Sequence, residues 1–180
     1  VVLGKTFLFD NAGVDTKINS AVYNCSGTLD MQGEGIQNGS EQSDDQKAKI
    51  CNLYGTAIAG NGGDDIEIIM NGEICGIKNG GNAINLNDAT NLQCTIGEAG
   101  YIHDNEVWAG SIYMQGNTTN LVIEGDIVNN ISTQHTAGIW LANNLTGKSK
   151  AIMKDTAEIS GNISYTTEVA AVIVSKGRFI

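Results

Sequence analysis

Acidic side chains in close pairs are the groups in this sequence with the clearest potential for catalysis. Hydrolysis of a glycosidic bond, for example, needs two carboxyl groups at a defined separation, one of them with a pKa raised by burial. Neither histidine offers these pairs a partner, because His103 and His135 each stand alone among residues typical of turns. We therefore expect no complete active site and assign no catalytic residues. The acidic pairs are Asp44-Asp45, Asp64-Asp65 and Asp104 with Glu106.

The segment from Gly60 to Ile66 partly resembles the calcium-binding nonapeptide G-G-x-G-x-D-x-U-x. Its second glycine is replaced by Asn61, its apolar residue comes one position early, and the motif does not recur in neighbouring units. Such sites form between successive repeats, so a single degenerate copy favours an acidic turn over a calcium site at Asp64 and Asp65. We expect no metal and no cofactor.

Short apolar segments recur along the chain, so a structural repeat positions the acidic residues and histidines described above. Each segment has apolar residues at its first and third positions, which is the alternation of a half-buried strand. Their starting residues lie 28, 27 and 33 positions apart. The segments are Ile84-Asn85-Leu86, Ile112-Tyr113-Met114, Ile139-Trp140-Leu141 and Val172-Ile173-Val174.

Two further elements complete each unit. A third element, from an apolar residue to Asn, should stack so that its Asn side chains form a hydrogen-bonded ladder. Asn also tolerates the left-handed backbone that sharp corners need. Three short strands cannot close a domain alone, so each unit must stack on the next. We align the second strands as Ile66-Glu67-Ile68, Leu92-Gln93-Cys94 and Leu121-Val122-Ile123, and the third elements end at Asn11, Asn38, Asn79, Asn105, Asn130 and Asn162.

This pattern predicts an all-β fold, a right-handed parallel β-helix of about six coils, as one domain over residues 1–180. A β-sandwich would not repeat the same trio of strands at this period, and the framework of leucine-rich repeats is missing. The polar segment 39–49 is predicted to be a loop insertion, and 143–149 a shorter one. The chain opens at Val1 without a leader and stops in mid-pattern, so we expect a fragment of a longer surface protein.

The four cysteines are Cys25, Cys51, Cys75 and Cys94. They include no close pair, which excludes the common zinc signatures. A disulfide such as Cys25–Cys51 is possible because one turn of the solenoid could bring these residues together. The alternative is that the cysteines are small buried apolar fillers. The redox compartment stays open.

A strip of side chains should face outward from the first strand of each unit, because its first and third positions face inward. In successive coils the strip consists of Asn85, Tyr113, Trp140 and Ile173. Apolar surface of this kind often marks an interaction site, and Tyr and Trp combine contact area with a polar group. The alternative is that loops of the chain cover the strip. Trp108 could flank the strip or fill a corner.

The units resemble the right-handed β-helix repeats of bacterial adhesin-like surface proteins. They are similar to the F-x-x-N and G-G-A-I motifs of polymorphic outer-membrane proteins, although Ile stands here where that family has Phe. The resemblance covers residues 55–175 well and the first 54 residues loosely. It implies a passenger or stalk that presents an adhesive surface, with no catalytic residues to transfer. The matching stretches are FLFDN (7–11), GGNAI (80–84), IHDNEVWAGSIY (102–113) and IVNNISTQHTAGIW (127–140).

Composition and charge narrow the function further. The net charge of −10 with only ten basic residues argues against nucleic acid, and no stretch approaches the length of a membrane span. We expect a non-enzymatic, extracellular or cell-surface protein that binds a glycan, a host protein or a sister chain through Tyr113, Trp140, Ile173 and Asn85. The alternatives are a polysaccharide-degrading enzyme or tailspike-like depolymerase, and a passive structural stalk. The pectin-hydrolase segments Gly-His-Gly and Arg-Ile-Lys do not occur.

Overall fold

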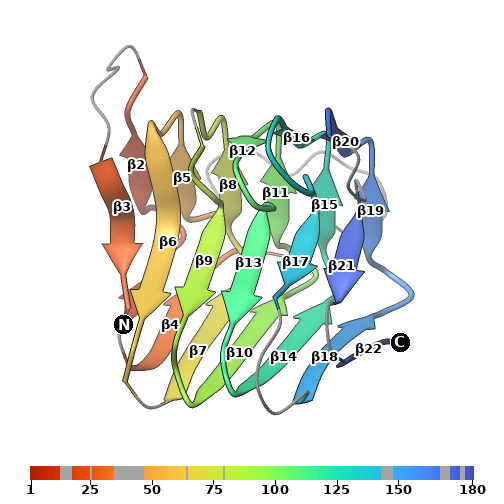
Figure 1. The fold of residues 1–180 in the computed structure, drawn as a ribbon. Coiled ribbons are helices and arrows are strands. Elements are labelled where there is room, and N and C mark those ends of the chain that lie inside the picture. Colours follow the sequence, from red (N-terminus) through yellow and green to blue (C-terminus); the bar gives the residue numbers. More distant parts are fainter. Residues whose placement is uncertain are drawn as a thin grey trace.

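The computed structural model describes residues 1–12, 18–24, 26–34, 47–63, 65–78, 80–142, 148–166, 171–174 and 177–180. Within these ranges the chain forms short β-strands joined by turns and bends, and no helix (Figure 1). Every pair of neighbouring strands is parallel. The described part of the chain contains no helix long and apolar enough to cross a membrane.

The strands form four parallel sheets, named A to D here. Sheet A contains β1 (Val2–Leu3), β4 (Gly27–Met31), β7 (Asp65–Met70), β10 (Asn91–Ile96), β14 (Thr118–Ile123), β18 (Lys148–Met153) and β22 (Gly177–Phe179). Sheet B contains β2 (Leu8–Asp10), β5 (Lys49–Cys51), β8 (Glu73–Cys75), β11 (Tyr101–His103), β15 (Asp126–Val128) and β19 (Glu158–Ser160). Sheet C contains β3 (Ile18–Tyr23), β6 (Gly55–Asn61), β9 (Ile84–Asn87), β13 (Ile112–Gln115), β17 (Ile139–Leu141) and β21 (Val172–Val174). The short sheet D contains β12 (Glu106–Val107), β16 (Ile131–Ser132) and β20 (Ile163–Ser164).

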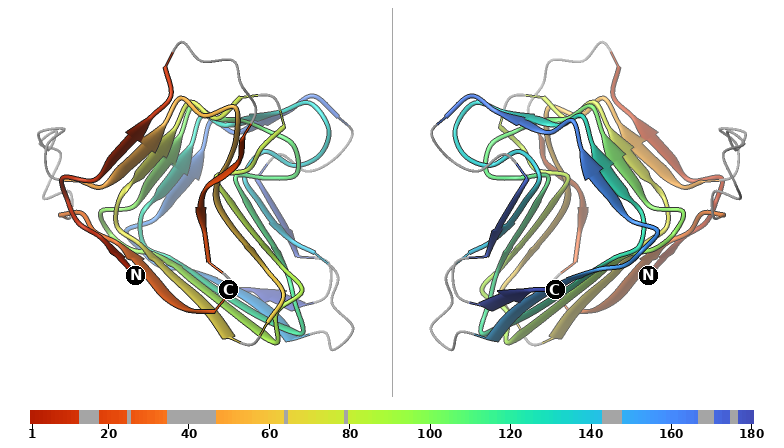
Figure 2. Two further views of the ribbon diagram at one scale, coloured as in Figure 1. Left: turned by 90° about the vertical axis from the view of Figure 1, so that its left-hand side faces the viewer. Right: turned by 90° about the vertical axis from the view of Figure 1, so that its right-hand side faces the viewer.

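Each coil passes from sheet C to sheet A, then to sheet B, and returns to sheet C, in the later coils through sheet D. Viewed along the stack, the three long sheets form three sides around a central core (Figure 2). The predicted parallel β-helix is confirmed as a parallel β-solenoid, with about five turns where the sequence predicted about six. Sheets B and C each stack six strands, and sheet A stacks seven.

The core lies between the three long sheets and consists of columns of apolar side chains, most of them Ile and Leu with some Met and Ala. The predicted stacking of Ile84 on Ile112, of Ile112 on Ile139, and of Ile139 on Val172 is confirmed by the strand register. The column continues upstream to Ile58, which pairs with Ile84. In β9 and β13 alternation with period two buries one face completely, because successive side chains of a strand point to opposite faces.

The register of the second strands differs from the sequence alignment. Cys94 pairs with Leu121, and Leu92 pairs with Thr119, so the predicted alignment of Leu92 with Leu121 is two residues out. A shift of two residues leaves every side chain on the same face of the sheet, and for this reason the apolar pattern alone could not detect it.

The corner after sheet B turns at a residue with positive φ in every described coil from the second onward. Asn, Asp and Gly fill this column because their side chains tolerate the left-handed region better than others. The predicted use of Asn at a sharp corner is therefore correct, although Gly and Asp serve equally. The column consists of Asn52, Gly76, Asp104, Asn129 and Gly161.

The Asn ladder stands one position after this column and, among the described residues, has three members, Asn105, Asn130 and Asn162. The prediction of six members was wrong. Asn11 instead occupies the corner position next to Asn52 in the coil register, since Asp10 pairs with Cys51 and the backbone N–H of Asn11 bonds to the carbonyl of Cys51. The ladder position of the third coil is Ile77, whose N–H donates to Asn105 Oδ1. Asn38 and Asn79 lie outside the described residues.

Of the predicted loop insertion at 39–49, residues 39–46 lie outside the described residues. Of the remainder, Lys47 forms an antiparallel bridge with Gly33, and Lys49 already belongs to β5. The shorter predicted loop at 143–149 lies outside the described residues up to position 147, and β18 begins at Lys148.

Candidate functional site

The predicted outward strip occupies one column on the outside of sheet C. Strand register places Asn85 beside Tyr113, Tyr113 beside Trp140, and Trp140 beside Ile173. Each of these four side chains is half-buried, whereas the residues on either side of Asn85, Tyr113 and Trp140 are fully buried and face the core. The sequence therefore identified the column correctly, but the strip is less exposed than an open sheet face would be.

Four rings on this side of the molecule form a connected group, called the aromatic cluster below. Tyr113 and Trp140 meet edge to face with their centroids 5.4 Å apart. His135 lies against Trp140 at 5.0 Å, and Trp108 meets His135 edge to face at 5.1 Å. His135 was predicted to stand alone, but the segment between β16 and β17 brings it beside both tryptophans.

Hydrogen bonds around Ser132 hold the segment that carries His135. The Ser132 hydroxyl accepts the backbone N–H of His135 at 3.1 Å and donates to the carbonyl of Trp108 at 3.1 Å. The Ser164 hydroxyl, one coil further on, donates to the carbonyl of His135 at 2.7 Å. These bonds hold the segment that carries His135 against Trp108 on one side and Ser164 on the other.

Polar groups border the aromatic cluster on sheet C. The Asn85 amide donates to Asn82 Oδ1 at 3.2 Å and accepts a hydrogen bond from the Asn87 amide. The Tyr113 hydroxyl donates to Gln115 Oε1 at 2.9 Å. Burial, with a smaller effect from the nearby Asp88 carboxylate, raises the pKa of Tyr113, so its hydroxyl keeps its proton. The aromatic cluster is therefore bordered by side-chain amides and a hydroxyl that are already hydrogen-bonded to one another.

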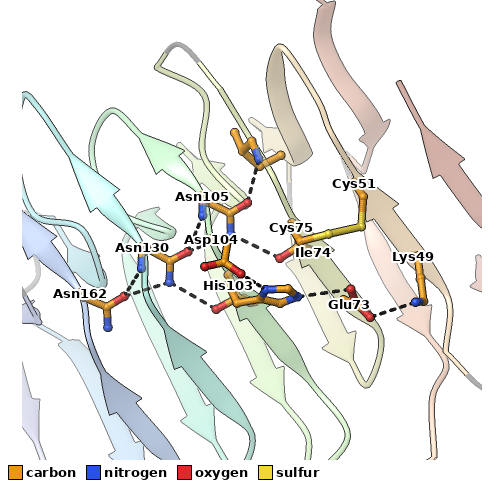
Figure 3. Close-up of polar contacts among 12 residues, drawn as sticks. Lys49, Cys51, Glu73, Ile74, Cys75, His103, Asp104, Asn105, Asn130 and Asn162 are labelled. Atoms are coloured by element: carbon orange, nitrogen blue, oxygen red, sulfur yellow. Dashed lines mark hydrogen bonds and ion pairs between the residues drawn. A yellow bond between two sulfur atoms is a disulfide. The ribbon is translucent and has the colours of Figure 1, made fainter. Parts of the chain in front are cut away.

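A second constellation, which the sequence did not reveal, lies on the outside of sheet B (Figure 3). His103 Nδ1 lies 2.7 Å from Asp104 Oδ2, and its Nε2 lies 3.2 Å from Glu73 Oε1. Lys49 Nζ lies 3.3 Å from the other oxygen of Glu73. The prediction that His103 stands alone was wrong because Glu73 is 30 residues away in sequence but only one coil away in space.

Within this constellation each charged group stabilises the charged form of its neighbour. The hydrogen bond from His103 lowers the pKa of Glu73, burial opposes this effect, and Lys49 adds to it. Burial alone would lower the pKa of His103, but the hydrogen bonds and charges of Glu73 and Asp104 outweigh burial and raise it. The two neighbouring carboxylates therefore favour the imidazolium form of His103 relative to a free imidazole. Tyr101 stacks on the imidazole ring with its centroid 3.9 Å away.

A disulfide joins Cys51 and Cys75 directly beside this constellation (Figure 3). The suggested pair Cys25–Cys51 is wrong, because Cys75 is the register partner of Cys51 on the next strand, with a Cα–Cα distance of 4.7 Å. Cys94 is a free thiol in the core, and burial raises its pKa to about 12. Cys25 lies outside the described residues.

The remaining acidic candidates show no paired-carboxylate site within the described residues. Asp65 accepts a hydrogen bond from the Asn91 amide at 2.6 Å, and Asp104 is engaged by His103. Glu106 is exposed on β12. Asp64, the other residue of the calcium prediction, lies outside the described residues, as do Asp44 and Asp45.

Comparisons of the chain with protein-family models, with curated proteins and with solved structures found no match.

Proposed function

We propose that this chain is a non-enzymatic binding module, displayed outside the cell in the manner of an adhesin, and that it binds a glycan through the aromatic cluster. The observation that carries the proposal is the connected group of Tyr113, Trp140, His135 and Trp108 on neighbouring coils. Trp108 keeps 45% of its surface exposed, which leaves an aromatic ring available to a partner.

The chemistry of the surroundings supports a glycan as the partner. Sugar rings present apolar C–H faces that pack on aromatic rings, and hydroxyls that bond to amides such as those of Asn85 and Asn87. The net charge of −10 favours a neutral or basic polymer over an anionic one. The disulfide between Cys51 and Cys75 accords with an oxidising compartment outside the cell.

Retention and chain length of purified polysaccharides test this proposal together. We expect a neutral polysaccharide to be retained without shortening, because the rings and amides provide contacts but no paired carboxylates. The double variant Tyr113→Ala/Trp140→Ala should lose at least tenfold in affinity. Tyr23→Ala, which removes an exposed Tyr from the same sheet three coils away, is the matched control and should bind normally.

The other outcomes each decide against the proposal. Shortened chains would identify a polysaccharide-degrading enzyme and direct attention to the acidic residues. Equal retention by the double variant and the parent chain would remove the aromatic cluster as the binding site. Absence of retention by any polysaccharide would leave a protein partner or a passive stalk as the function.

A further inference from the structure

The disulfide and the charged constellation of sheet B share one small area of the outer surface. The sulfur atoms of Cys51 and Cys75 and a carboxylate oxygen of Glu73 all lie within 4.8 Å of one another. Strand pairing fixes this arrangement, because Cys51 and Cys75 are register partners, and Glu73 and Cys75 are two positions apart on the same face of β8. Three potential metal ligands are thus held by rigid strands rather than by loops.

His103 lies beside these three residues on the next strand and contacts Glu73. It is the register partner of Cys75, and its Nε2 points to Glu73 Oε1 at 3.2 Å. Its other nitrogen, Nδ1, is held by the Asp104 carboxylate at 2.7 Å. A carboxylate on the far nitrogen is the usual way in which proteins orient a metal-binding imidazole. Lys49 stays on the second oxygen of Glu73, which leaves Oε1 as the oxygen that faces His103.

The disulfide blocks this set of ligands, because only a thiolate binds a metal ion through Cys sulfur. A dithiol reductant removes the block: the two electrons and two protons that it gives up reduce the S–S bond to two thiols, while the dithiol itself becomes a disulfide. Metal binding then displaces the thiol protons and replaces the hydrogen bond between His103 and Glu73. Two thiolates, one imidazole and one carboxylate are a four-ligand set suited to zinc.

We propose that Cys51, Cys75, Glu73 and His103 form a binding site for a thiophilic divalent cation once the Cys51–Cys75 disulfide is reduced. The disulfide thus controls whether the site can bind the cation. This inference goes beyond the proposed glycan-binding function and does not depend on it. Tyr113 and Trp140 of the aromatic cluster lie on sheet C, whereas Cys51, Glu73, Cys75 and His103 lie on sheet B.

Cobalt and zinc titrations of the two redox forms test the inference. The background carries Cys25→Ser and Cys94→Ala, so that only Cys51 and Cys75 can react. After reduction and removal of the reductant, the chain should bind one Co²⁺ with the charge-transfer absorption of a thiolate ligand, and Zn²⁺ should abolish that absorption. The oxidised chain should show neither effect. Glu73→Gln and His103→Gln should each weaken zinc binding roughly tenfold or more.

The controls separate a built site from simple binding by a dithiol. His135→Gln and Glu106→Gln remove the same types of side chain away from the proposed metal site and should leave the zinc affinity of the reduced chain unchanged. Cys51→Ser/Cys75→Ser should keep the β-sheet circular dichroism and bind no Co²⁺. The inference fails if the reduced chain shows no thiolate absorption, if reduction abolishes the β-sheet signal, or if Glu73→Gln and His103→Gln both bind zinc as tightly as their parent.

Discussion

Replacing Asn130 tests how much the Asn ladder contributes to the stability of the stack. The side chain is completely buried and makes four hydrogen bonds. Its oxygen accepts the backbone N–H of Asn105 at 3.2 Å and the Asn105 amide at 2.9 Å. Its own amide donates to the carbonyl of Ile102 at 3.2 Å and to Asn162 Oδ1 at 2.9 Å.

The loss of stability in Asn130→Ala depends on which hydrogen-bond partners of the Asn130 side chain keep another hydrogen bond. The Asn105 amide also donates to the carbonyl of Ile74, and Asn162 Oδ1 also accepts the backbone N–H of residue 130. The N–H of Asn105 loses this partner in a buried place, whereas the carbonyl of Ile102 belongs to β11, which is also paired with β15. A net bond is worth about 1 kcal/mol, and an orphaned buried group costs about 1–3 kcal/mol. We therefore expect Asn130→Ala to lower the free energy of unfolding by roughly 3–5 kcal/mol.

Urea unfolding followed by circular dichroism measures this loss as a lower midpoint at an unchanged slope. Asn162→Ala, at the half-buried end of the ladder, should cost less, about 2 kcal/mol, since three bonds are lost there. Asn120→Ala, on the outer face of β14, is the control and should change stability by less than about 0.5 kcal/mol. A loss below about 1 kcal/mol for Asn130→Ala, or a larger loss for Asn162→Ala, would refute the reasoning.

Three further outcomes follow from single groups. Because the pKa of His103 is raised in the folded chain, His103 stabilises the fold fully below about pH 6.5, and this contribution is lost as pH rises through its folded pKa. Because the pKa of Glu73 is lowered, Glu73 stabilises the fold above about pH 4.3, and this contribution is lost as pH falls through its folded pKa. His103→Gln should therefore reduce the free energy of unfolding most between these pH values, and a constant difference from pH 4 to 8 would contradict the bridge. Thr119→Val should raise thermal stability by about 1 kcal/mol, because the buried Thr119 hydroxyl has no hydrogen-bond partner among the described residues; a lower melting temperature would contradict this. Cys94 in the folded chain should resist alkylation until denaturant is added, as mass spectrometry would show, and rapid labelling without denaturant would disprove its burial.

The parts of the fold that the sequence predicted are those in which one residue type is required in every coil. Inward positions of sheet C must be apolar in each turn, so the column from Ile84 to Val172 could be identified without coordinates. The left-handed corner restricts the chain to Asn, Asp or Gly, which gave its turn signal. The ladder was predicted too long because Ile77 fills the same buried position with an apolar side chain.

The candidate sites were predicted less completely, because their chemistry joins residues from different coils. Tyr113 and Trp140 were found since both belong to the column that the repeat identifies. His103 and Glu73 belong to different columns of sheet B, so their contact could be found only with the coil register known to the residue. A correct register would also have placed Cys51, Cys75 and His103 in one column, and that alignment is the sequence signal for the reduced metal site.

Strand order in each of the three long sheets follows coil order, so every coil contacts only the coils before and after it. Opening of the native structure should therefore begin at the two ends, where Val2, Leu8 and Phe179 are exposed, and move inward one coil at a time. Amide hydrogen exchange should form a gradient along the stack, slowest near β9 and β13 and fastest at β1 and β22. Damage to one terminal coil would shorten this solenoid without dissolving it.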